Sequence, residues 1–129
     1  KALDGKLAVV DAGVKAETKD WTPFVVQTAL ETMRSAIGEY EESIENGKFA
    51  KAVEYQDSRG FVFQGAALLQ SVAPALTAKY SDDLAKAMTE IAVLKSAWPA
   101  PLPPPAPVLD VAQVTGAISK VELALGNVK

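Results

Sequence analysis

Apolar residues recur along most of this chain at intervals of three and four residues, which is the spacing of one face of an α-helix. The longest of these stripes follows Trp21 and consists of Val26, Leu30, Met33, Ile37, Tyr40 and Ile44. Stripes of the same period recur in later segments, and no segment alternates apolar and polar residues over a convincing length. The pattern therefore predicts an all-α protein in which each helix buries one side.

Capping residues and breaks in the stripes set the expected bounds of the helices. Thr22 and Pro23 suit the N-cap and the first position of the longest helix. Gly47 suits the position after its end, because a left-handed conformation there costs glycine little. We predict an antiparallel four-helix bundle with an additional N-terminal helix at residues 3–16, and with main helices at residues 22–47, 48–73, 81–98 and 110–125.

Prolines and polar caps mark the remaining boundaries. Pro74 should end or bend the third helix, and Ser81 should cap the fourth. Six of the eight prolines lie in the link Pro99–Pro107, which we expect to be an extended crossover before the last helix. A Pro-rich ligand for another domain is the alternative interpretation of this link. Asp110 and Gln113 predict a capping box where the last helix begins.

The stripes also predict the core. Gly60 and Gly65 would let a neighbouring helix come close. Tyr40 should be buried with its hydroxyl at the rim, whereas Tyr55 should be exposed. A fully buried Ile37 would make Ile37→Ala cost about 2–5 kcal/mol. The residues expected to be buried are Leu30, Met33, Ile37, Val53, Phe63, Leu84, Ile91, Leu94, Val114, Ile118 and Val121.

Composition narrows the possible functions. A length of 129 residues fits a single domain over residues 1–129. The net charge of −3 and the scattered positions of the 13 Lys and Arg residues speak against nucleic-acid binding. No apolar run approaches the length of about 18 residues that a membrane span needs. The chain begins at Lys1 rather than Met, which we interpret as a mature or trimmed product.

The chain has neither cysteine nor histidine. Zinc sites of the usual kind, thiolate chemistry and catalysis by Ser-His-Asp or Cys-His groups are therefore excluded. The sequence also lacks a P-loop, a dinucleotide-binding fingerprint and an HExxH motif. We therefore do not expect an enzyme.

Most of the remaining polar chemistry lies on the two arms of the predicted turn at Gly47. Glu39 and Glu42 form an i, i+3 pair on one arm, and Glu54 and Asp57 form a second pair on the other. Antiparallel arms would bring the two pairs together. These carboxylates are hard oxygen donors, which suit Fe(III), Ca²⁺ or Mn²⁺ better than Cu(I) or Zn²⁺. The phenol oxygen of the neighbouring Tyr55 is a further candidate metal ligand.

The same residues have a simpler interpretation, a solvated acidic face without a ligand. The helical phase favours this alternative, because Glu42 and Glu54 fall beside the core stripe. The two arginines also have local explanations. Arg34 is expected to pair with Glu31, and Arg59 with Glu54, along their own helices.

The segment from Tyr40 to Val62 reads Y-x3-I-x2-G-x6-EYQDSRGFV. It resembles the extracytoplasmic helical domain that accompanies bacterial high-affinity iron permeases and, more distantly, imelysin-like periplasmic bundles. The later layout is also similar, with a helix ending at Trp98-Pro99, a Pro-rich link and a terminal amphipathic helix.

The resemblance implies an extracytoplasmic location, periplasmic or secreted, and an accessory role in iron or other metal uptake. It implies a membrane iron permease or another periplasmic protein as partner. Only Glu54, Tyr55 and Asp57 carry over from the family's segment. The REXXE motif of the permease is absent, because Gly60 follows Arg59, and so is the HxxE motif of imelysin-like bundles. The alternative function is a structural or protein-interaction bundle with no small-molecule ligand.

Overall fold

The structure is a computed structural model that describes residues 21–129. The predicted N-terminal helix at residues 3–16 lies outside the described residues. Apart from two strands of two residues each, the regular structure of the described chain is helical, as the periodicity predicts. The elements are α2 (Trp21–Arg34), α3 (Ala36–Ser43), β1 (Ile44–Glu45), β2 (Lys48–Phe49), α4 (Ala52–Ser71), α5 (Ala73–Lys95) and α6 (Val111–Ala124).

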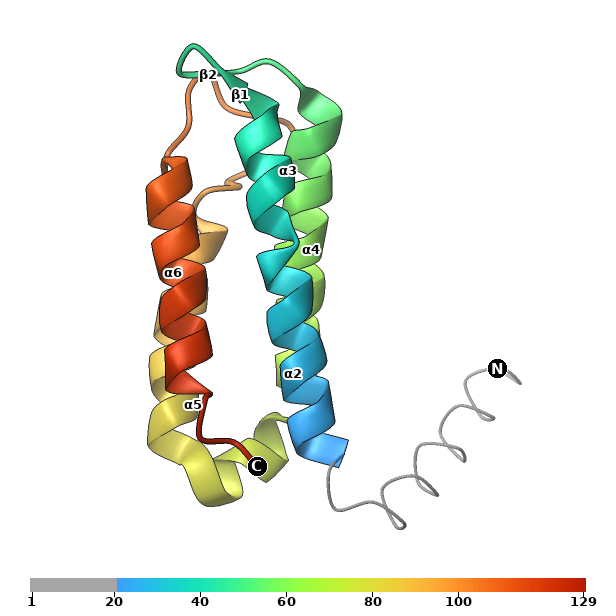
Figure 1. Cartoon of the computed structure of the whole chain (residues 1–129), viewed down its shortest axis with the longest axis vertical. Helices are drawn as coiled ribbons and strands as arrows, with labels where there is room; N and C mark the ends of the chain where they lie inside the picture. Colours follow the sequence, from blue (N-terminus) through green and yellow to red (C-terminus); the bar gives the residue numbers. More distant parts are fainter. Residues whose placement is uncertain (1–20) are drawn as a thin grey trace, which may run out of the picture.

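The helices pack as an antiparallel bundle (Figure 1). α2 and α3 together form one column, α4 returns beside them, and α5 and α6 form an antiparallel pair. α4 also contacts α5, and α6 contacts both α2 and α3, so the columns close around one core. The predicted four-helix bundle is therefore confirmed.

The first column is interrupted at Ser35, between α2 and α3. Three hydroxyl groups donate to carbonyl oxygens one turn earlier, from Thr28 to Phe24, from Thr32 to Thr28 and from Ser35 to Glu31. Such bonds compete with the backbone ladder and bend helices. The interruption is slight, because Ser35 keeps right-handed helical angles and its N–H still donates to the Glu31 carbonyl oxygen at 3.1 Å.

The turn at Asn46 and Gly47 is a β-hairpin, not the predicted junction of two helices. α3 ends at Ser43, and β1 pairs antiparallel with β2 so that Ile44 lies opposite Phe49. Asn46 and Gly47 have positive φ angles of 54° and 75°, which a two-residue type I′ turn requires. Asn-Gly favours this turn strongly, so the sequence does carry the signal, and the two helices were predicted too long.

The junction of α4 and α5 bends the chain by 100°. Pro74 lies in the first turn of α5, where its missing N–H costs little, so the predicted end of the third helix is confirmed. α5 runs past the predicted cap Ser81 and is broken only at Tyr80, which has a non-helical φ of −129°. No single described helix is long and apolar enough to cross a membrane; α4 and α5 meet that criterion only as a bent pair.

The Pro-rich link joins α5 to α6 and crosses the hairpin end of the bundle (Figure 1). It is neither helix nor strand, as expected for Pro99–Pro107. Asp110 accepts a hydrogen bond from the Gln113 backbone N–H, and the Gln113 side chain accepts one from the Asp110 N–H. The predicted capping box is therefore confirmed. Thr22 is not the N-cap of α2, because Trp21 is already helical.

The predicted core is largely correct. Val53 is 63% exposed, contrary to the prediction, and Ile37 and Phe63 are only half-buried. Ile37→Ala should therefore cost less than the full core penalty of about 2–5 kcal/mol. Burial is confirmed for Leu30, Met33, Leu84, Ile91, Leu94, Val114, Ile118 and Val121.

The phase of α4 was predicted wrongly because Phe49 was counted as part of that helix. Phe49 lies in β2, and α4 begins after it with a phase of its own. The helix consequently buries Tyr55, Val62 and Leu69 and leaves Val53 in solvent. Tyr55, predicted to be exposed, is fully buried.

Close approach of helices occurs at one of the two predicted glycines. A Cβ atom on Gly65 would lie 2.6 Å from Met33 Cγ and 2.9 Å from the Ala29 carbonyl oxygen. The backbones of α2 and α4 therefore approach closely at Gly65. Gly60 faces open space, so the prediction for that position was wrong.

Candidate metal centre

An aromatic cluster holds α3, β2 and α4 together at the hairpin end. Its members are Tyr40, Phe49, Tyr55 and Trp98, which contact one another edge to face. The ring centroids are 5.2 Å apart for Tyr40–Trp98, 5.9 Å for Tyr40–Phe49 and 4.9 Å for Phe49–Tyr55. Such pairs contribute about 0.5–1.5 kcal/mol each beyond their buried area. The aromatic cluster thus fixes how α3 approaches α4.

Two buried serines satisfy the polar groups around the aromatic cluster. The Nε1–H of Trp98 donates to Ser58 Oγ at 2.8 Å, and the Ser58 hydroxyl donates to the Tyr55 carbonyl oxygen at 2.7 Å. The Ser43 hydroxyl donates to the Tyr40 carbonyl oxygen. Because these buried polar groups have partners, the cluster forms a rigid support.

Both tyrosine hydroxyls of the cluster fasten the Pro-rich link. The Tyr55 hydroxyl donates to the Ala100 carbonyl oxygen at 2.7 Å, and the Tyr40 hydroxyl donates to the Leu109 carbonyl oxygen. Burial, together with the nearby Tyr55 and Asp110, raises the pKa of Tyr40 to about 12, so this phenol is a neutral donor at neutral pH. As predicted, the Tyr40 ring lies in the core and its hydroxyl at the rim.

Tyr55→Phe should loosen the link while leaving the core filled. The change removes the hydroxyl that holds Ala100 but keeps the buried ring, so we expect a loss of about 0.5–1.5 kcal/mol. The backbone NMR order parameters of Leu102 and Val108 should fall. The control Tyr80→Phe removes a hydroxyl that accepts a hydrogen bond from the C-terminal residue, and it should leave the order parameters of the link unchanged. Unaltered order parameters in Tyr55→Phe would mean that this hydrogen bond does not hold the link.

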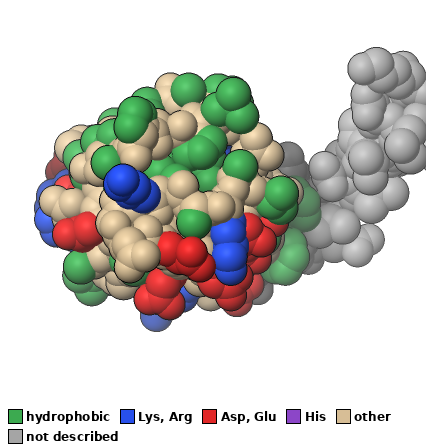
Figure 2. Space-filling view, turned by 90° about the horizontal axis from the view of Figure 1, so that it is seen from above, with side chains coloured by type: hydrophobic (Ala, Val, Ile, Leu, Met, Phe, Trp, Pro, Cys, Tyr) green, Lys and Arg blue, Asp and Glu red, His purple; other side chains and the backbone are tan. Residues whose placement is uncertain are grey.

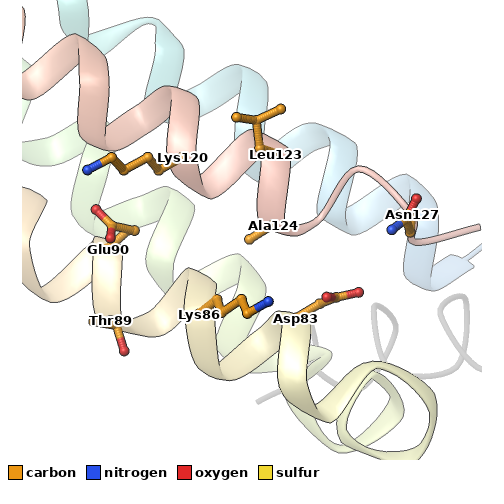
Figure 3. A pocket seen from close by; sticks show the side chains of 8 residues that line it. All are labelled: Asp83, Lys86, Thr89, Glu90, Lys120, Leu123, Ala124 and Asn127. Carbon is orange, nitrogen blue, oxygen red and sulfur yellow. The ribbon is translucent and has the colours of Figure 1, made fainter.

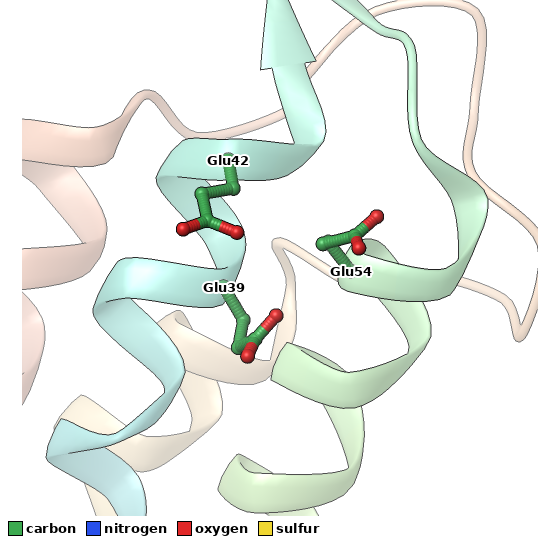
Figure 4. Close-up of side chains that lie close together, drawn as sticks. All are labelled: Glu39, Glu42 and Glu54. Carbon is green, nitrogen blue, oxygen red and sulfur yellow. The ribbon is translucent and has the colours of Figure 1, made fainter.

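Three carboxylates converge on the outer side, where α3 and α4 face each other (Figure 4). Glu39 and Glu42 extend from α3 and Glu54 from α4, and one oxygen of each lies within 4.8 Å of the other two. Glu39 and Glu54 are half-buried, and Glu42 is exposed. The structure thus brings together three of the residues predicted as metal ligands, which we call the carboxylate group.

Asp57 lies near the carboxylate group without joining it. The pKa of Glu39 is raised, first by desolvation and then by the negative charges of Asp57, Glu42 and Glu54. All four predicted carboxylates are therefore close enough to interact electrostatically. A cation placed among them would relieve their mutual repulsion.

Tyr55, the fifth predicted ligand, points away from the carboxylate group. Its ring is fully buried in the aromatic cluster, and its hydroxyl donates to Ala100. Successive residues of a helix point to different sides, so Tyr55 faces inward where Glu54 faces outward. We therefore leave Tyr55 out of the candidate metal centre.

Neither arginine pairs along its own helix, contrary to the prediction. Arg34 of α2 binds Glu122 of α6: its Nε donates to Oε2 at 2.8 Å and its Nη2 to Oε1. The Cζ atom of Arg59 lies 4.3 Å from the centroid of the Phe63 ring. Glu54 precedes Arg59 by five positions, which places the two on different sides of α4.

Glu39→Gln should stabilise the protein near neutral pH. Because the folded-state pKa of Glu39 is raised, the folded protein binds this proton more tightly than the unfolded chain does. Stability therefore falls as the pH rises from about 4.3, the unfolded value, through the folded pKa. The melting temperature of Glu39→Gln should exceed that of the wild type at neutral pH and converge with it in acid. An equal gain in Glu41→Gln, which removes a charge outside the carboxylate group, would contradict this account.

The hairpin end as a whole is acidic. Residues 36–57 contain six carboxylates and two lysines, a net charge of −4, whereas the whole chain carries −3. Figure 2 looks onto this end and shows acidic side chains gathered along one side. Their combined field raises the local concentration of cations near the carboxylate group.

A groove between α5 and α6 has less specific chemistry (Figure 3). It has a volume of about 560 Å³, and Leu123, which is 80% exposed, lies at its edge. Its charged side chains are Asp83 and Glu90 together with Lys86 and Lys120. Because these charges balance, the groove favours neither a cation nor an anion, and the carboxylate group is the stronger candidate site.

These features define the chain as an antiparallel helical-bundle domain with a carboxylate-rich end. A family model described as the iron permease-associated 4-helix bundle domain matches residues 15–128, and the chain belongs to this family. Membership of this family associates the domain with iron uptake. The predicted membership of the iron permease family is confirmed; the match does not bear on imelysin-like bundles. No significant match to a curated protein or to a solved structure is found.

Proposed function

We propose that this domain is an extracytoplasmic accessory in iron uptake that binds a hard cation and presents it to a membrane permease. The cation would be held by Glu39, Glu42 and Glu54, with Asp57 beside them. The observation that carries this proposal is the convergence of carboxylate oxygens from two helices within 4.8 Å. Family membership supplies the connection with iron uptake and with a permease.

The spacing of the three oxygens limits the size of the cation. Ca²⁺ binds oxygen at about 2.3–2.6 Å, so ligands on opposite sides of the ion are separated by roughly twice that distance. The observed limit of 4.8 Å lies within this range. A smaller ion, with bonds of about 2.0–2.1 Å, requires the carboxylates to close in. The exposed side chain of Glu42 has the freedom to do so.

The charge of the site favours a cation of high charge. Without a cation the carboxylates repel one another, and this repulsion adds to desolvation in raising the pKa of Glu39. Since Coulomb energy grows with charge, Fe(III) gains more from these ligands than Ca²⁺ or Mn²⁺. Zn²⁺ and Cu(I) lack their preferred ligands, because the chain has no histidine or cysteine.

Hard cations should raise the melting temperature of the wild type, because a ligand that binds only the folded state stabilises it. Thermal denaturation with weakly chelated Fe(III), Ca²⁺, Mn²⁺ or Zn²⁺ measures the effect. The double variant Glu39→Gln/Glu54→Gln should lose the response. It should also be more stable than the wild type without metal, since it relieves the repulsion among the carboxylates.

A matched control distinguishes cation binding at the carboxylate group from general attraction of cations to the acidic end. Glu41→Gln/Glu45→Gln removes the same charge from the same end of the bundle but leaves the carboxylate group intact. It should retain the response to cations. If both double variants lose the response equally, or if no hard cation stabilises the wild type, the proposed site does not exist.

The second candidate function is an interaction bundle with no small-molecule ligand. The exposure of Glu42 favours it, since a solvated carboxylate needs no metal. This alternative predicts that melting is insensitive to cations at constant ionic strength. The same denaturation series therefore distinguishes the two functions.

A further inference from the structure

Two cationic side chains approach a single aromatic ring between α4 and α5. The Cζ atom of Arg59 lies 4.3 Å from the centroid of the Phe63 ring, and Lys95 Nζ lies 4.9 Å from the same centroid. Arg59 is one turn before Phe63 on α4, and Lys95 is in the last turn of α5. The two charges are therefore no further apart than the sum of these distances.

No carboxylate neutralises this pair. Within residues 21–129 neither Arg59 nor Lys95 has an acidic group at ion-pair distance. The nearest acid in sequence, Asp57, is two positions from Arg59 and so lies on another side of the helix. The two like charges repel each other, and an anion that contacts both would relieve this repulsion.

Arg59 also has unused hydrogen-bonding capacity. Its Nε is buried and has no hydrogen-bond partner, the one such side-chain atom among the described residues. Its terminal nitrogens form no hydrogen bond in the described chain and reach solvent. Arg34 shows the usual arrangement, since its Nε and Nη2 both donate to Glu122. The Arg59 donors that a ligand can reach are therefore its terminal nitrogens.

Cation–π contact alone does not explain the arrangement. The face of Phe63 attracts each cation, and the carboxyl end of α5 attracts Lys95, but neither feature supplies a full negative charge. Neither supplies acceptors matched to the planar guanidinium. An oxyanion supplies both, because its oxygens accept charge-assisted hydrogen bonds from Arg and Lys together.

We infer that Arg59, Phe63 and Lys95 form a binding site for an oxyanion, a carboxylate or a phosphate group. The guanidinium would donate to the oxyanion from its solvent-facing nitrogens, Lys95 would approach it as a second donor, and Phe63 holds both cations in place. This oxyanion site is separate from the carboxylate group formed by Glu39, Glu42 and Glu54, and its charge is opposite to theirs. It therefore goes beyond the proposed cation-binding function and does not depend on it.

The full chain, titrated with succinate or with inorganic phosphate, tests this site by heteronuclear NMR. The Arg59 Nε–H gives a side-chain signal of its own, which should shift on binding. Sodium chloride at matched ionic strength is the control for general screening. Lys95→Gln should weaken binding by about tenfold, the effect of losing one charge-assisted hydrogen bond. Lys86→Gln removes the same charge elsewhere on α5 and should leave the affinity unchanged.

A saturable shift with succinate or phosphate that Lys95→Gln weakens supports the site, and the tighter ligand identifies carboxylate or phosphate chemistry. Arg59→Lys keeps the charge but removes the planar fork, so it should also weaken binding. The site is refuted if sodium chloride reproduces the shifts, or if Lys95→Gln and Lys86→Gln bind as the wild type does. Lys95 is the last residue of α5 and is only half-buried, and glutamine keeps most of its side chain, so Lys95→Gln should fold.

Discussion

Trp98→Ala should lower the free energy of unfolding by about 3–5 kcal/mol, the usual cost of removing a buried aromatic side chain. Trp98 is only 2% exposed, lies 5.2 Å from the Tyr40 ring and donates its Nε1–H to Ser58. Its removal leaves a cavity where α3 and α4 meet the link, and it deprives Ser58 of that donor. Denaturant unfolding followed by circular dichroism measures the loss.

Two further variants test whether burial causes this effect. Phe24→Ala removes an aromatic ring that is 63% exposed, and it should change stability by no more than about 0.5 kcal/mol. Trp98→Phe keeps a ring but removes the N–H donor. Its loss of unfolding free energy should therefore lie between those of Phe24→Ala and Trp98→Ala. A loss below about 1 kcal/mol in Trp98→Ala would mean that the aromatic cluster does not support the hairpin end.

The aromatic cluster also connects stability with the proposed function. Tyr40 and Tyr55 of this cluster lie on the same two helices as the carboxylate group, α3 and α4. If the aromatic cluster sets the distance between these helices, Trp98→Ala should weaken cation binding as well as stability. Cation titration of the folded variant, below its melting temperature, would show whether the two effects occur together.

Gly65→Ala should destabilise the protein by about 1–3 kcal/mol, the usual cost of overpacking a core. The added Cβ would meet Met33 Cγ at 2.6 Å and the Ala29 carbonyl oxygen at 2.9 Å. The Met33 side chain has rotamers that move it away, but the Ala29 carbonyl belongs to the backbone of α2. The helices must therefore separate, and the contacts on both sides of Gly65 loosen.

Gly60→Ala is the matched control on the same helix. Nothing lies within 4 Å of the added Cβ, so the change should stabilise α4 by about 0.5–1 kcal/mol through helix propensity alone. The two substitutions are chemically identical, yet they should change the free energy of unfolding in opposite directions. If Gly65→Ala is also stabilising, then α2 and α4 do not approach each other as closely as described.

Features that depend on near neighbours in the chain were predictable. The apolar stripes located the helices, Pro74 located the bend between α4 and α5, and Asp110 with Gln113 predicted a capping box that the structure contains. The i, i+3 spacing of Glu39 and Glu42 correctly placed two carboxylates on one side of α3. In each case the interaction closes within one helical turn, so residue type and spacing are sufficient to specify it.

The phase of α4 was not predictable from its stripe alone. Phe49 and Val53 continue a helical spacing, but the hairpin at Asn46 and Gly47 separates Phe49 from the helix. Tyr55 therefore turned inward and Val53 outward, the reverse of the prediction. A short apolar stripe fits more than one phase, and packing against α3 and Trp98 selects between them.

Pairings between distant parts of the chain were decided by the tertiary structure. Arg34 has Glu31 within reach on its own helix, yet it pairs with Glu122, 88 positions away, because α6 packs beside α2 and presents both carboxylate oxygens to the guanidinium. Glu54 joins Glu39 and Glu42 because the hairpin folds α4 against α3, as the predicted antiparallel arms implied, but their distances depend on how the two helices pack. Residue types and local spacing thus determined the helices, their caps and the acidic character of one end. The distances between side chains of different helices depend on the relative placement of those helices, which the packing of the aromatic cluster and of Gly65 sets.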